Sequence, residues 1–181
     1  MSDGPSILLE SARTYLARGY AVIPVPARKK IPVLKGWTDL RLSESDLPSH
    51  FNGTGNIGVL LGEPSGWLID VDLDCDEAVA LAPKFLPPTG AMSGRPGKPA
   101  SHWWYVCEGV KTRKHQDPVS KKMIVELRST GAQTVVGPSI HPSGDPYDPL
   151  DGEPAVVICS YQFAYTKRAE LAAVPWDLVV I

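Results

Sequence analysis

Aspartates alternate with other residues through the segment WLIDVDLDCDE, which covers residues 67–77. Side chains at positions i and i+2 of a strand lie on one face, so we expect Asp70 and Asp72 to project together. Carboxylates held this close repel one another, and a bound cation would compensate them. Oxygen ligands of this kind suit Mg²⁺ or Mn²⁺, and magnesium commonly binds a few carboxylates together with substrate phosphates. The pair therefore predicts a divalent metal site for nucleotide chemistry, with a solvated strand end as the alternative.

The remaining acids of this segment have a local explanation. Asp74 and Glu77 have the spacing of a helix N-cap and its capping-box partner, and Asp76 favours the positive end of the same helix. A calcium-binding EF-hand loop is excluded, because Cys75 stands where that loop needs glycine and Leu81 stands where it needs glutamate.

Two further segments carry groups that could act on the same ligand. Glu126 lies in MIVELR, an alternating strand in which an acid needs a partner, and a shared metal ion would supply one. Arg128 lies on the face of Glu126, and we expect it to bind phosphate oxygens. His102 begins a strand after the loop SGRPGKPAS, whose Arg95 and Lys98 suit phosphate.

The elements that must position these groups are short and separated by proline and glycine turns. We expect helices at residues 6–18, 43–51, after Asp74 and at 168–173, and strands at 20–24, 57–61, 67–73, 102–107, 123–128, 133–139 and 155–159. Residues 83–99 are expected to form a loop. Helices early in the chain and strands late predict an α+β fold in a single domain, residues 1–181.

The segment QTVVGPSIH would extend the site. We expect strands 123–128 and 133–139 to form a hairpin closed by the loop STGA. This pairing would place Ser139 and His141 on the face of the metal ligands, where His141 reaches either the phosphates or the template. Gly137 would leave room for a substrate to approach the backbone.

Composition limits the partners and the compartment. The 18 basic and 20 acidic residues nearly balance, so a nucleic-acid partner needs local clusters, which occur at 28–30 with Lys35 and at 111–122. The three cysteines form neither a zinc pattern nor a disulfide framework. No apolar segment has bilayer length, and the N-terminus has no signal-peptide character. We therefore expect a cytoplasmic protein with no membrane partner.

The segments IDVD, SHWWY and VELR, in this order and followed by QTVVGPSIHPSG, resemble the three motifs of the prim-pol family. Its members are bifunctional DNA primase/polymerase domains of the archaeo-eukaryotic primase superfamily. The opening GYAVIPVPARKKIPVLKGW and the final AAVPW are also similar, so the resemblance covers nearly the whole chain. It implies the archaeo-eukaryotic primase fold, in which an N-terminal α/β lobe packs on an RRM-like mixed-sheet lobe with the active site between them.

The resemblance also implies roles for individual residues. Asp70, Asp72 and Glu126 take the places of the catalytic metal ligands for Mg²⁺ or Mn²⁺, although the family often has aspartate in the position of Glu126. His102 takes the place of a histidine that contacts the phosphates of the incoming nucleotide. The expected nucleotide-binding residues are His102, Arg128, Ser139, His141 and Arg95, and the expected DNA-binding residues are Lys30 and Lys35.

The implied function is a DNA-templated nucleotidyltransferase, both primase and polymerase, that joins NTPs or dNTPs by two-metal-ion catalysis. Its expected partners are a single-stranded DNA template and a replicative helicase domain, in the same chain or separate. The chain would then be an excised domain of a longer phage, plasmid or prokaryotic replication protein. The alternatives are a non-catalytic DNA-binding module of a replication initiator and a sugar-nucleotide transferase. The retained acids argue against the first, and no glycan-binding feature supports the second.

Overall fold

The computed structural model describes residues 6–157 together with Tyr165 and Arg168. Its helices are α1 (Ile7–Ala17), α2 (Leu47–His50) and α3 (Asp76–Phe85), with 3₁₀ turns η1 (Trp37–Asp39) and η2 (Glu63–Ser65). Its strands are β1 (Val22–Pro26), β2 (Gly55–Leu60), β3 (Leu68–Leu73), β4 (Met92–Arg95), β5 (Lys98–Val106), β6 (Arg113–Gln116), β7 (Met123–Arg128), β8 (Gln133–Val136) and β9 (Ala155–Val156).

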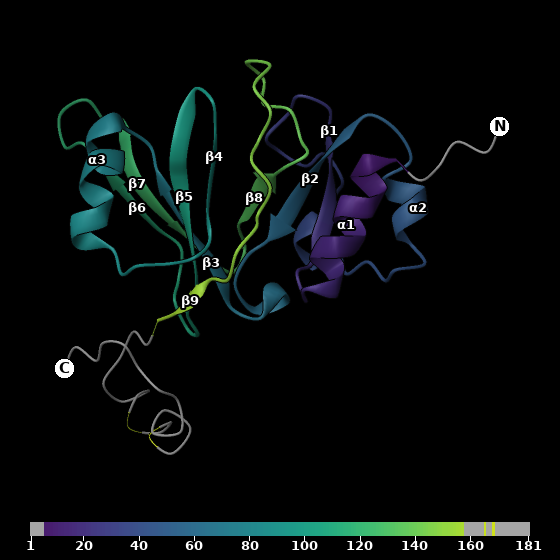
Figure 1. The fold of residues 1–181 in the computed structure, drawn as a ribbon, viewed down its shortest axis with the longest axis horizontal. Helices are drawn as coiled ribbons and strands as arrows, with labels where there is room; N and C mark the ends of the chain where they lie inside the picture. Colours follow the sequence, from purple (N-terminus) through teal and green to yellow (C-terminus); the bar gives the residue numbers. More distant parts are fainter. Residues whose placement is uncertain (1–5, 158–164, 166–167, 169–181) are drawn as a thin grey trace.

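The strands form two sheets that lie side by side (Figure 1). The small sheet has the order β1-β2-β8 with antiparallel neighbours. The large sheet has the order β4-β5-β3-β7-β6, and β9 pairs with β5 in parallel. Figure 1 shows α1 and α2 beyond the small sheet and α3 beyond the large one. The α+β class predicted from the sequence is confirmed, and none of the described helices is long and apolar enough to span a bilayer.

β3 is buried along its whole length and has two chemically different faces. Ile69, Val71 and Leu73 pack with α3 in one apolar cluster. The opposite face carries Asp70 and Asp72, which are also buried. The apolar face anchors the strand, and this anchoring holds the two carboxylates in a fixed position.

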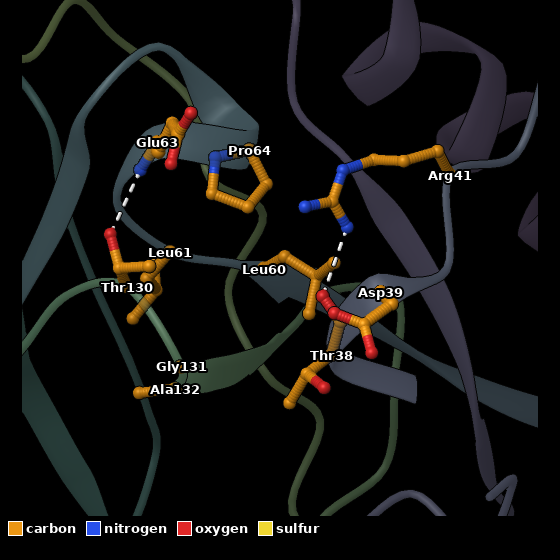
Figure 2. A pocket seen from close by; sticks show the side chains of 10 residues that line it. All are labelled: Thr38, Asp39, Arg41, Leu60, Leu61, Glu63, Pro64, Thr130, Gly131 and Ala132. Carbon is orange, nitrogen blue, oxygen red and sulfur yellow. Dashed lines mark hydrogen bonds between the residues drawn. The ribbon is translucent and has the colours of Figure 1, made fainter. Parts of the chain in front are cut away.

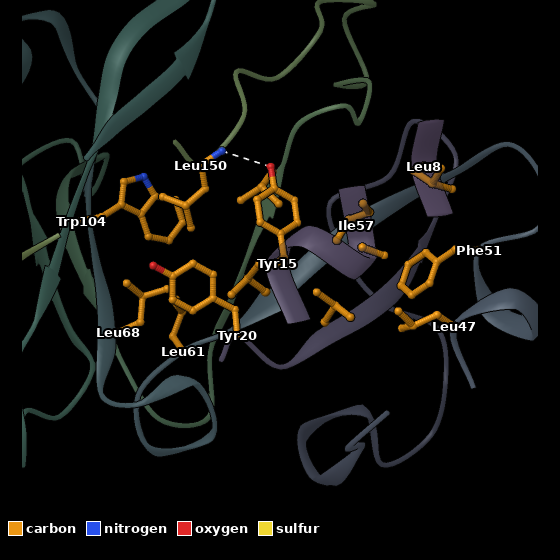
Figure 3. Packing of buried hydrophobic residues seen from close by; sticks show 14 of the residues in the cluster. Leu8, Tyr15, Tyr20, Leu47, Phe51, Ile57, Leu61, Leu68, Trp104 and Leu150 are labelled. Carbon is orange, nitrogen blue, oxygen red and sulfur yellow. Dashed lines mark hydrogen bonds between the residues drawn. The ribbon is translucent and has the colours of Figure 1, made fainter. Parts of the chain in front are cut away.

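α1 begins at Ser6, whose Oγ accepts a hydrogen bond from Leu9 N–H at 3.2 Å, and it ends before Gly19, which has a φ of +82°. The buried side of α1 packs in a core that both sheets share (Figure 3). Members of this core include Leu8 and Tyr15 of α1, Ile57 of β2, Val136 of β8, Leu68 of β3 and Trp104 of β5. One apolar core therefore fixes the two sheets against each other.

The structure departs from the predicted elements in several places. β4 lies inside the segment predicted as a loop, and β6 was not predicted because its four exposed residues show no apolar alternation. The predicted helix 168–173 lies outside the described residues apart from Arg168.

The predicted hairpin of residues 123–128 and 133–139 is wrong. β7 lies between β3 and β6, so both of its edges are paired, and β8 pairs with β2 in the other sheet. Gly137 does not leave an open face either. A Cβ there would lie 2.5 Å from the carbonyl oxygen of Tyr147, so this glycine allows two backbone segments to approach closely.

Tyr15 connects α1 to the segment that follows β8. Its phenol donates a hydrogen bond to Gly137 O at 2.7 Å and accepts one from Leu150 N–H at 3.1 Å, the second of which is drawn in Figure 3. Tyr15→Phe leaves both backbone groups without this partner, so we expect the free energy of unfolding in urea to fall by about 1–3 kcal/mol. Thr14→Val, on the exposed side of α1, is the control and should change it by less than about 0.5 kcal/mol. Equal losses in the two variants would contradict a structural role for the Tyr15 phenol.

Candidate active site

The acidic face of β3 continues across the neighbouring strands as rows of opposed residues. Asp72 lies opposite His102 of β5 on one side and opposite Glu126 of β7 on the other. Asp70 lies opposite Arg128 of β7. Directly opposed residues share a face, so the register of three strands gathers these five side chains on one side of the large sheet.

Asp70 is fully buried and well supplied with polar partners. Its Oδ2 lies 3.0 Å from His102 Nδ1 and accepts a hydrogen bond from Thr134 Oγ1 of β8 at 2.6 Å. Burial alone would raise the pKa of Asp70, but His102, Arg128 and Thr134 lower it below its ordinary value. For the imidazole of His102 the directions are reversed. Burial alone would lower its pKa, but the carboxylate of Asp70 raises it above its ordinary value. The two residues therefore form a buried ion pair that also contacts the small sheet.

Arg128 contacts the carboxylates of three acids. Its Nη2 lies 2.5 Å from Asp72 Oδ2, and its Nε donates a hydrogen bond to Glu126 Oε2 at 2.9 Å. Its Nη1 lies 3.8 Å from Asp70 Oδ2. Burial alone would raise the pKa of Glu126, but Arg128 lowers it, whereas burial keeps the pKa of Asp72 above its ordinary value. Arg128 therefore compensates much of the negative charge on this face.

Asp72, Asp74 and Glu126 each bring one carboxylate oxygen into a group whose members lie within 4.8 Å of one another. Each also pairs with a basic side chain, and these pairs are Asp72 with Arg128, Asp74 with Lys98 at 3.2 Å, and Glu126 with Lys114 at 3.2 Å. Three converging carboxylates are a donor set that suits a hard divalent cation, so the residues fit the metal ion expected from the sequence.

Asp74 does not have its predicted role. The N-cap of α3 is Cys75, which makes no side-chain capping hydrogen bond. Asp74 N–H instead donates to Ile124 O at 2.8 Å, which continues the pairing of β3 with β7. The alternate spacing of Asp70, Asp72 and Asp74 is the sequence signal for this placement, since all three lie on one face of an extended strand. Asp70 lies beside the converging group and is not one of its three members.

Apart from Asp70, these side chains line a pocket of about 520 Å³ that contains residues of both sheets. The large sheet contributes Asp72, His102 and Glu126, and the small sheet contributes Gln133 and Thr134. The other cationic or imidazole side chains of the lining are Lys30, Arg95, Lys98, Lys114, Arg128 and His141. An anionic ligand that carries a divalent cation is complementary to such a mixture of acids and bases.

The pocket includes most, but not all, of the residues predicted to contact nucleotide or DNA. The residues that line it are Arg95, His102, Arg128, His141 and Lys30. Ser139 is buried elsewhere, and its Oγ accepts a hydrogen bond from Ile57 N–H of β2 at 2.8 Å, next to the end of the pairing between β2 and β8. Lys35 is exposed in the loop next to Lys30 and is not part of the lining.

A second pocket of about 250 Å³ lies beside η1 and η2 (Figure 2). Figure 2 shows Arg41 next to Thr38 and the hydrogen bond from Glu63 N–H to Thr130. Ala132 lines both pockets, so the two adjoin. The larger pocket contains three of the four predicted catalytic residues, namely Asp72, His102 and Glu126, whereas Asp70 is fully buried and is not part of its lining.

The sequence was also compared with known proteins. Residues 12–171 match the family model described as "Bifunctional DNA primase/polymerase, N-terminal", and this range contains every residue that lines the larger pocket. The search of curated proteins found no match.

The converging acids predict an effect of Asp74 on metal binding. We expect Asp74→Asn to weaken Mn²⁺ binding, measured by calorimetric titration, by at least about ten-fold, because one of three converging carboxylates loses its charge. Asp76→Asn is the matched control, because it removes the same charge from a residue that is exposed in the first turn of α3. Equal affinities in the two variants would remove Asp74 from the metal site.

Proposed function

Because this chain belongs to the bifunctional DNA primase/polymerase family, we propose that it is a DNA-templated nucleotidyltransferase that synthesises primers and extends them from NTPs or dNTPs. One structural observation supports the proposal in addition to the family match. The converging carboxylates of Asp72, Asp74 and Glu126 lie in the same pocket as a surrounding set of basic side chains. Such a pocket accommodates a cation and a polyphosphate together.

The carboxylates would hold Mg²⁺ or Mn²⁺. Asp72, Asp74 and Glu126 supply the three oxygens that lie together, and Asp70 provides a fourth carboxylate next to them on β3. When bound, the ions would favour ionisation of the primer 3′-hydroxyl and neutralise charge on the phosphates. Binding of the phosphates and of the template would depend on the other side chains in and around the pocket.

The basic side chains can exchange one anionic partner for another. Arg128, Lys98 and Lys114 each pair with a carboxylate. When cations compensate those carboxylates, the same three side chains are free to turn toward phosphate oxygens, which keeps the charges of the pocket balanced. His102 stays in place through Asp70 and presents the rest of its ring to the pocket, where it would contact the triphosphate.

The template would approach from the loop that carries Lys30 and Lys35. Both lysines are exposed, and Lys30 also lines the pocket, so this loop connects the catalytic side chains with the surface. Lysines so placed bind the phosphates of single-stranded DNA without reading its sequence. Primer synthesis of this kind serves DNA replication, and the partner it implies is a replicative helicase domain, in the same chain or separate.

A nucleotide incorporation assay tests the proposal. Labelled nucleotides with Mn²⁺ should enter product on both primed and unprimed single-stranded templates. Asp72→Asn should reduce the rate at least about a hundred-fold, since metal ions contribute several kcal/mol of transition-state stabilisation. Asp76→Asn should keep wild-type activity.

The outcomes separate the competing functions. A wild-type protein that binds template but incorporates no nucleotide would be a non-catalytic DNA-binding module. Incorporation on primed template alone would limit the activity to extension. Full activity of Asp72→Asn would contradict the assignment of the catalytic acids.

A further inference from the structure

Tyr147 lines the larger pocket, and its hydroxyl has no hydrogen-bond partner among the described residues. Its ring packs with Val25 and Val135 of the small sheet, and the residue is only 7 % exposed. The phenol oxygen is buried and has no partner among the described residues, although Tyr147 lines the pocket. A buried hydroxyl without a partner costs free energy, so its retention at a binding pocket points to a partner that arrives with the ligand.

The surroundings of the hydroxyl indicate the chemistry of that partner. The rings of Tyr147 and His141 are arranged edge to face, with their centroids 5.6 Å apart. Burial raises the pKa of Tyr147 to about 12, and the charged groups that act on it are Arg95, Asp72 and Arg128. The hydroxyl therefore remains a hydrogen-bond donor at neutral pH, within electrostatic range of both basic and acidic side chains of the pocket.

We propose that the Tyr147 hydroxyl donates a hydrogen bond to a phosphate oxygen of the nucleotide that binds in the pocket. This inference rests on the proposed function, because it assumes a nucleoside triphosphate as the ligand. A phosphate is the partner that the location favours. Arg95 and Arg128 attract a polyphosphate to this part of the pocket, and the converging carboxylates would hold the cations that accompany it. A neutral donor then adds a contact without adding a further charge.

Tyr147→Phe removes the hydroxyl and keeps the ring. We would titrate ATP and, separately, inorganic tripolyphosphate into the wild type and this variant in the presence of Mg²⁺. The affinity for both ligands should fall by the same factor, about ten- to hundred-fold, because the lost hydrogen bond is made to a charged group. Tripolyphosphate has no sugar or base, so a shared loss places the contact on phosphate.

Tyr105→Phe is the matched control. The Tyr105 phenol donates a hydrogen bond to Pro87 O at 2.8 Å and does not line the pocket. This variant should bind both ligands like the wild type and have a lower melting temperature. Tyr147→Phe should instead keep or raise the melting temperature without ligand, since it removes a hydroxyl that has no protein partner.

Three results would overturn the inference. Unchanged affinity of Tyr147→Phe for both ligands would leave the hydroxyl without a role in binding. If Tyr147→Phe loses affinity for ATP but not for tripolyphosphate, the hydroxyl contacts the sugar or base instead of a phosphate. A wild-type protein that binds neither ligand would also refute the inference. The proposed function is tested separately by incorporation. Binding that depends on Tyr147 in a protein that incorporates no nucleotide would contradict that function and uphold the contact.

Discussion

The structure depends on the compensation of several carboxylates that are crowded on one face of the large sheet. Asp70 and Asp72 are buried, and Glu126 lies beside them on the next strand. Without His102 and Arg128, each carboxylate would raise the pKa of its neighbours, and the acids would have to take up protons or the strands would have to separate. The guanidinium can contact all three because its five N–H donors are arranged as a rigid fork. Lysine at this position would provide one point charge and could not bridge them.

This compensation works only in one strand register. Arg128 lies opposite Asp70, and Glu126 lies opposite Asp72, so a shift of β7 by one residue would turn both side chains to the face that packs on α3. Apolar side chains alternate with the acids on β3, and their burial against α3 makes such a shift costly. The hydrophobic pattern of β3 therefore specifies the electrostatics of its other face.

The sequence predicted β3 and β7 well, because a period of two is a local property and both strands show it clearly. The same period also predicted that Asp70 and Asp72 share a face of β3 and that Glu126 and Arg128 share a face of β7. Asp74 was assigned to a helix cap because its spacing to Glu77 also fits a capping box, and the choice depends on whether Ile124 extends the pairing of β3. The position of β8 could not be predicted locally. Its neighbour in the sequence, β7, has both edges occupied, and one of these is covered by β6, whose charged residues carry no strand signal. Thr134 and Tyr147 reach the pocket through such tertiary placement, so neither was identified.

The two sheets contact each other through a polar contact in the pocket and through a shared apolar core. Because these contacts are separate, the ion pairs of the pocket can exchange partners while the sheets stay in place. The polar contact is the hydrogen bond from Thr134 to Asp70, with Arg128 Nη1 3.3 Å from Thr134 Oγ1. A ligand that attracts Arg128 away from the acids would alter this contact. The apolar contact is the shared core, where Leu68 and Trp104 of the large sheet pack in one cluster with residues of the small sheet. This core contains no charge, so it is unaffected when ion pairs in the pocket are exchanged. The relative position of the sheets is therefore set by hydrophobic packing, and the acids and bases of the pocket can rearrange around a ligand while the strands that carry them stay in place.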